Sequence, residues 1–197
     1  KFQSEIKIST TDIKYNIKHD GDLILDFSRI HMSLDKGRAF GINPKLSGTK
    51  TKTVDRILNA DIYKKKEVRD NFNELTLKFK GNYRIVFRAY NEGIAYRFES
   101  DIKGDIIVEN ELSEFNFLHD AKAYIPYVRD NVATLESQFG NPFENIYKYE
   151  NISQWDTSRI AFLPLLVEGR NGKKLCILEA DLLNYPGMYL YNGDGSN

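Results

Sequence analysis

One carboxylate stands at a position where it could bind a ligand. Glu179 directly follows the run Lys174–Leu178, which is apolar enough to be a core strand. A Tyr-Pro-Gly turn at residues 185–187 and a second apolar run, Met188–Leu190, come next. An acid at the end of a buried strand is costly to desolvate unless it is paired or bound to a metal ion. The pattern alone leaves two interpretations open: a strand end whose glutamate reaches solvent, and a metal-binding or charge-paired site.

Other residue types that carry chemistry are sparse. The three histidines, His19, His31 and His119, are far apart in sequence and lack the spacing of metal ligands. Cys176, the single cysteine, lies in an apolar run and is expected to be a small core residue rather than a nucleophile. The chain has no nucleophile-elbow, phosphate-loop or dinucleotide motif, and no pair of carboxylates marks a glycosidic acid and base. We therefore expect no catalytic residue in this chain.

Composition narrows the class of protein. The 28 lysines and arginines balance 28 aspartates and glutamates. A net charge of 0 argues against a nucleic-acid binder, which needs a basic excess. No apolar run approaches the roughly 20 residues of a membrane-spanning helix. The 197 residues suffice for one domain with a substantial core, and no internal repeat or linker divides them.

Alternating apolar and polar residues predict strands. Glu5–Ser9 and Ile13–Lys18 alternate with period two, and an Asp-Gly turn then leads into Leu23–Phe27. Residues 73–100 carry the clearest signal, three strands joined by two tight turns. Many short strands with Gly/Asn turns, and no convincing amphipathic helix, predict an all-β fold, an antiparallel β-sandwich.

Two other stretches carry different expectations. Residues 35–70 have little periodicity and are expected to form an irregular loop or edge region. Within them, Lys64–Lys66 fits a solvated edge strand better than an anion site, because edge lysines discourage sheet-to-sheet aggregation. The apolar run Ile160–Val167 suits a strand covered on both faces.

One predicted sheet face carries three arginines, Arg84, Arg88 and Arg97. Such a face could bind an acidic ligand. Cross-strand ion pairs with Glu92 and Glu99 are the expectation we favour, because opposite charges on neighbouring strands commonly pair.

Three blocks of sequence together resemble one family. They are Asn73–Leu77 with Ile85–Phe98, then Leu163–Leu165, then Leu178–Leu190. In combination they are similar to the N-terminal domain of glycoside hydrolase family 97, whose members include bacterial α-glucosidases and α-galactosidases. The resemblance covers essentially the whole chain, residues 1–197. It implies an antiparallel β-supersandwich similar to galactose mutarotase.

The family architecture implies that more chain is needed for activity. In the family this domain precedes a catalytic (β/α)8 barrel and a small C-terminal β domain. It is also longer than 197 residues, so we expect a fragment that lacks the barrel and closing strands. The resemblance implies two partners, the protein's own catalytic barrel domain and an oligosaccharide or α-glycoside substrate. It also implies that this chain alone is catalytically inactive. The sugar, the linkage and the retaining or inverting outcome depend on barrel residues.

The resemblance also assigns a role to Glu179. In the family, a glutamate in a His/Leu-Glu-Ala segment binds a calcium ion beside the catalytic centre, and Glu179 matches it. This chain has Leu178 where many members have histidine, and Asp181 where a small residue is common. Calcium takes about 6–8 oxygen ligands, so Glu179 would be one ligand of a site completed by the barrel. Calcium there can orient the substrate and stabilise developing charge.

Two other functions remain as alternatives. The chain could be an independent carbohydrate-binding module that stacks Tyr124, Tyr127 or Trp155 on a sugar, although core packing is the default role of such aromatic residues. A free-standing mutarotase-like enzyme would need histidine and glutamate in one cleft, which the sparse histidines argue against. The family resemblance implies a bacterial protein in a periplasmic or extracellular location.

Overall fold

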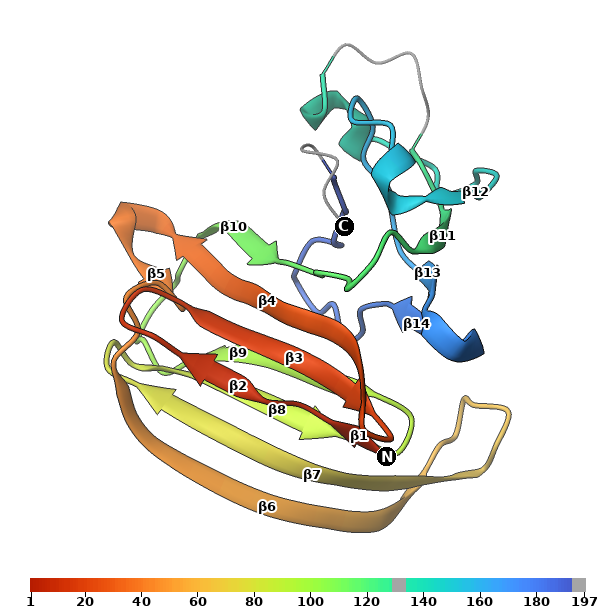
Figure 1. Cartoon of the computed structure of the whole chain (residues 1–197). Coiled ribbons are helices and arrows are strands. Elements are labelled where there is room, and N and C mark those ends of the chain that lie inside the picture. The colour runs from red at the N-terminus through yellow and green to blue at the C-terminus, as the bar shows by residue number, and fades with distance from the viewer. Residues whose placement is uncertain (129–133, 193–197) are drawn as a thin grey trace. The chain divides into compact units, whose positions relative to one another are not determined.

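The computed structural model describes residues 1–128 and 134–192. They fall into two compact units, one of residues 1–116 and a second that begins at Phe117. Both units consist of antiparallel strands with short 3-10 turns, which confirms the predicted all-β class (Figure 1). Within the described ranges no helix is long and apolar enough to cross a membrane.

The first unit contains two antiparallel sheets, shown as stacked layers in Figure 1. One sheet has the order β1-β3-β4-β10, with β2 on β3 and β5 on β4. Its strands are β1 (Phe2–Gln3), β2 (Ile6–Ile8), β3 (Ile13–His19), β4 (Asp22–Leu34), β5 (Ala39–Phe40) and β10 (Val108–Ser113). The other sheet has the order β6-β7-β8-β9. Its strands are β6 (Leu46–Asn59), β7 (Glu67–Phe79), β8 (Tyr83–Ala89) and β9 (Ile94–Ser100).

Aromatic side chains join the two sheets of the first unit. Tyr15 of β3 packs against Phe87 of β8, with ring centroids 6.1 Å apart, and Phe40 of β5 stacks on Tyr83 at 4.4 Å. The Tyr83 hydroxyl accepts a hydrogen bond from the Gly41 amide at 3.1 Å. A side chain at Gly41 would place its Cβ 2.7 Å from the Ile30 carbonyl oxygen, so the close approach of these strands requires glycine.

The arginines predicted on one sheet face form ion pairs. Arg84 of β8 pairs at 2.5 Å with Glu99 of β9, which confirms the cross-strand expectation for this pair. Arg97 pairs with the same carboxylate, but from two residues earlier on the same strand, so that pair is not a cross-strand pair. The prediction was wrong for Glu92. Arg88 pairs at 2.8 Å with Glu74, which lies directly opposite it on β7, whereas Glu92 lies in the turn before β9.

The region of residues 35–70 is more regular than the sequence predicted. Strand β6 pairs along its length with β7, so the irregular-loop prediction was wrong, although β6 is indeed a sheet edge. Nearly all of its side chains are exposed, which explains why the sequence shows no apolar alternation. Lys64–Lys66 lie in the turn between β6 and β7 rather than in an edge strand.

The second unit contains one four-stranded sheet with the order β12-β11-β13-β14. Its strands are β11 (Lys122–Ile125), β12 (Lys148–Asn151), β13 (Leu165–Glu168) and β14 (Lys174–Ile177). The predicted strand Ile160–Val167 was too long. Ala161 makes isolated bridges and β13 begins only after Pro164, which has no amide hydrogen to donate.

Cys176 is exposed, so its prediction as a core residue was wrong. Successive side chains of a strand point to opposite faces. In β14 the half-buried Leu175 and the buried Ile177 face the interior, and Cys176 between them faces outward.

Candidate functional site

Glu179 lies just beyond β14 in the second unit, at the position where the sequence predicted a ligand. Its carboxylate accepts a hydrogen bond from the Met188 amide, with Oε1 at 2.8 Å and Oε2 at 2.9 Å. A Cβ at Gly187 would lie 3.2 Å from Oε1, so the backbone of this turn approaches the carboxylate closely. The side chain is half-buried and its orientation is therefore set by the chain that returns to it.

The segment between Glu179 and Met188 is a loop anchored at both ends. Asp181 and Asn184 adopt positive φ angles of 62° and 56°, and the Leu183 amide donates to the Asp181 carbonyl at 2.9 Å. After the turn, Leu190 pairs with Ala161 through two backbone hydrogen bonds of 2.8 and 2.9 Å. These contacts hold the carboxylate on a closed loop.

The donor chemistry of Glu179 fits a calcium ligand. A carboxylate has about four lone-pair sites, and one amide hydrogen occupies only part of that capacity. Calcium prefers oxygen ligands and takes about 6–8 of them. Within residues 1–128 and 134–192 no group of three or more His, Cys, Asp or Glu side chains could hold a metal ion. Glu179 fits a metal site as a single ligand.

Large apolar side chains surround Glu179 in sequence and are exposed to solvent. Leu178 is 62% exposed and Leu183 is 79% exposed, and Leu182 and Tyr191 are exposed as well. We call residues 178–191 the Glu179 segment. Several exposed apolar side chains on one short segment are typical of a surface that contacts another part of a protein.

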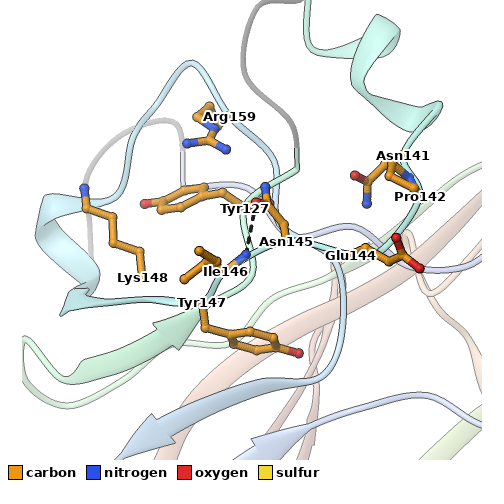
Figure 2. A pocket seen from close by; sticks show the side chains of 9 residues that line it. All are labelled: Tyr127, Asn141, Pro142, Glu144, Asn145, Ile146, Tyr147, Lys148 and Arg159. Atoms are coloured by element: carbon orange, nitrogen blue, oxygen red, sulfur yellow. Dashed lines mark hydrogen bonds between the residues drawn. The ribbon is translucent and has the colours of Figure 1, made fainter.

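A cavity of about 370 Å³ lies elsewhere in the second unit (Figure 2). Its lining combines aromatic, amide and charged side chains: Tyr127, Asn141, Pro142, Glu144, Asn145, Ile146, Tyr147, Lys148 and Arg159. Its volume falls within the range of about 300–1,000 Å³ that is usual for small-molecule sites. The sequence patterns did not identify this cavity, because most of its residues come from loops without periodicity, Lys148 at the start of β12 being an exception.

The aromatic residues considered as sugar-stacking platforms are mostly buried. Tyr127 is 2% exposed and Trp155 is 6% exposed, so neither offers a ring face to a sugar. The Tyr127 hydroxyl donates to Glu150 at 2.6 Å and accepts from the Asp156 amide at 2.8 Å. Burial, followed by this bond to Glu150, raises the pKa of Tyr127 above its usual range. The burial of Tyr127 and Trp155 therefore contradicts the hypothesis that these two rings stack on a sugar.

Tyr124, the third of these residues, is half-buried and stacks on Tyr149 with ring centroids 4.6 Å apart. The neighbouring ring occupies one of its faces. Two of the three histidines have local contacts. His19 stacks on Phe2, with ring centroids 4.5 Å apart. Burial, together with the nearby Arg29, lowers the pKa of His31.

Comparisons with known proteins cover the whole chain. The family model described as "Glycosyl-hydrolase 97 N-terminal" matches residues 1–197. A retaining α-galactosidase of Bacteroides thetaiotaomicron is 44% identical over 186 residues, which are 94% of this chain and 28% of that protein. The chain therefore spans little more than a quarter of the length of this relative.

Solved structures show the same fold at lower identity. A glycoside hydrolase family 97 enzyme from Pseudoalteromonas sp. strain K8, in complex with acarbose, matches with a TM-score of 0.79 and 20% identity. The match covers 97% of this chain and 29% of that one. A β-arabinopyranosidase matches with a TM-score of 0.74 and 20% identity, covering 89% of this chain and 29% of its own.

Proposed function

Because the chain belongs to the glycosyl-hydrolase 97 N-terminal family, we propose that it is the N-terminal domain of an α-glycosidase. In this proposal the domain docks on a catalytic barrel domain and supplies Glu179 to a calcium ion at the active site. The substrate is an α-galactoside or a related α-glycoside, a class supported by the 44% identity to a retaining α-galactosidase. The location we propose is periplasmic or extracellular, in a bacterium.

The observation that carries the metal proposal is the hydrogen bonding of Glu179. The Met188 amide orients the carboxylate, and most of its lone pairs remain available. The chain after the loop is fixed by the pairing of Leu190 with Ala161, and this pairing holds the Met188 amide against the carboxylate. A glutamate that only had to reach solvent would not need such support. An ion completed by oxygen atoms of another domain accounts for a lone, oriented carboxylate.

The docking proposal is supported by the exposed leucines of the Glu179 segment. Leu178 and Leu183 would be buried against the catalytic domain, and burial of apolar surface stabilises about 25 cal/mol per Å². The same contact would bring Glu179 to the mouth of the barrel, where such barrels keep their active sites. The isolated chain then binds calcium poorly and hydrolyses nothing.

When bound, calcium would orient the substrate and stabilise the charge that develops in an oxocarbenium-like transition state. The residues of this chain would hold the calcium ligand in place. The Met188 amide fixes the rotamer of Glu179, and the pairing of Leu190 with Ala161 fixes the loop. The general acid and the nucleophile or base belong to the catalytic domain in this proposal.

The test is the calcium dependence of α-galactoside hydrolysis by the full-length protein. Glu179→Gln keeps a side-chain oxygen that accepts from Met188 but removes the negative charge, whereas Glu179→Ala removes both. We expect both variants to need more calcium for half-maximal activity, with the larger change in Glu179→Ala. Asp181→Asn, two residues away at a positive φ that asparagine tolerates, is the matched control. Equal calcium dependence in all four proteins would reject the proposal.

A further inference from the structure

The cavity of the second unit contains buried donors that lack partners. Three buried side-chain polar atoms of the described residues make no hydrogen bond, and two of them, Asn141 Nδ2 and Arg159 Nε, belong to residues that line this cavity. Buried polar groups are almost always paired, with protein, ordered water or a ligand. Two such donors at one cavity indicate a site that an oxygen-rich molecule completes.

Arg159 is held in a fixed orientation. Its guanidinium lies over the Tyr127 ring, with Cζ 4.8 Å from the ring centroid, and Nη2 donates to the Val128 carbonyl. Tyr127 is itself fixed by its bonds to Glu150 and the Asp156 amide. A guanidinium preorganised in this way loses little side-chain entropy when it binds oxygen atoms.

The remaining polar groups of the cavity suit hydroxyl groups. The Lys148 ammonium pairs with Glu150 at 2.5 Å, so much of its charge is compensated. The Glu144 carboxylate supplies an acceptor, and Figure 2 shows it on the same side as Asn141, with Tyr127 and Arg159 on the other side. Residues that carry donors and an acceptor line this cavity, and such a combination suits sugar hydroxyls, each of which both donates and accepts.

The cavity and the Glu179 segment are connected through Tyr189. The Tyr189 hydroxyl donates to the Phe139 carbonyl at 3.1 Å, and the two rings pack edge to face at 5.1 Å. Tyr189 also contacts Phe143, with centroids 6.2 Å apart. Asn141 lies between these two phenylalanines in sequence, so the segment that positions Glu179 also supports one wall of the cavity.

We propose that this cavity is a saccharide subsite, in which Asn141, Glu144 and Arg159 bind hydroxyl groups of the glycoside substrate or product. The class of ligand rests on the proposed function. The location of the site rests on the unpaired donors of Asn141 and Arg159. The subsite contributes binding and leaves bond cleavage to the catalytic domain. Losing it should therefore raise KM and leave kcat nearly unchanged.

The test uses the full-length protein with Asn141→Ala and the conservative Arg159→Lys. Asn91→Ala, in an exposed turn of the first unit, and Arg170→Lys, at an exposed site of the second, are the matched controls. Kinetics on an α-galactoside are combined with calorimetric titration of methyl α-galactopyranoside and panose. We expect each cavity variant to raise KM, and the Kd for at least one sugar, about 3- to 10-fold, the usual worth of one hydrogen bond.

The thermal midpoint and calcium affinity of each variant are measured in parallel, and the proposal requires both to stay at the wild-type value. Unchanged KM and sugar affinity in both cavity variants would overturn the subsite. So would a fall in kcat or in calcium affinity alone, since that result would make these residues supports of the Glu179 segment. If the Glu179 variants leave calcium binding intact, the metal proposal fails, but the sugar titrations still decide the subsite independently.

Discussion

The two units differ in how their arginines are paired. In residues 1–116 every arginine lies in an ion pair with a carboxylate: Arg29, Arg38, Arg56, Arg69, Arg84, Arg88 and Arg97. In the second unit Arg159 contacts a carbonyl oxygen and a tyrosine ring, and its Nε has no hydrogen-bond partner among the described residues. Within residues 1–128 and 134–192, the hydrogen bonds that Glu179 accepts come from the Met188 backbone amide. The comparison separates a unit whose arginines are all paired with carboxylates from a unit in which Arg159 and Glu179 keep hydrogen-bonding capacity.

The largest effect should come from the core of the first unit. Phe87 is 4% exposed and packs against Tyr15 and Tyr96, so Phe87→Ala should lower the free energy of unfolding by about 3–5 kcal/mol. Urea denaturation measures this change. The control is Ile62→Ala, whose side chain is fully exposed in the β6–β7 turn and which should shift stability by less than about 0.5 kcal/mol. Equal losses in both variants would contradict the described core.

A smaller loss of stability is expected from the hydrogen-bond network of the Tyr127 hydroxyl in the second unit. Tyr127→Phe leaves the Glu150 carboxylate and the Asp156 amide without their shared partner, and should cost about 1–3 kcal/mol. Tyr149→Phe is the matched control, because the Tyr149 hydroxyl bonds to Glu168 at an exposed site. A Tyr127→Phe protein as stable as wild type would show that this network is not needed, and would weaken the preorganisation assigned to Arg159.

The smallest effect concerns Glu74, which bridges Lys52 and Arg88 on the outer sheet face. Burial raises the pKa of Glu74, but the bonds from Arg88 and Lys52 outweigh burial and hold the pKa below its ordinary value of 4.5. A lowered folded-state pKa adds stability above about pH 4.5 that is lost as the pH falls through the folded-state value. Glu74→Gln should therefore cost about 1–2 kcal/mol near pH 7 and progressively less below pH 4.5. A cost independent of pH would refute the ionic role.

The first unit could largely be predicted from sequence, because its strands alternate. The turns around Gly81 and Gly93 and the core face of β8 follow directly from the period-two pattern. Strand β6 was missed because its sheet-edge position exposes both faces, so burial imposes no alternation. Glu92 was misassigned because pairing register, which places Glu74 opposite Arg88, is not contained in one strand's sequence.

The second unit could be predicted only in part. The position of Glu179 beyond a strand was correct, and its role came from family resemblance rather than from its pattern. The cavity residues Asn141 and Arg159 lie 18 positions apart in the sequence, in loops with no periodic signal. Only tertiary structure brings them to one cavity and leaves their donors unpaired.

The central claim is that Glu179 is one ligand of a calcium site completed by another domain. Calorimetric titration of calcium into the full-length protein, with and without Glu179→Ala, and into residues 1–197 alone tests it most directly. The account predicts tight binding by the full-length protein, binding weakened at least about tenfold by Glu179→Ala, a loss of about 1.4 kcal/mol, and little binding by the isolated chain. Unchanged calcium affinity in Glu179→Ala would contradict it.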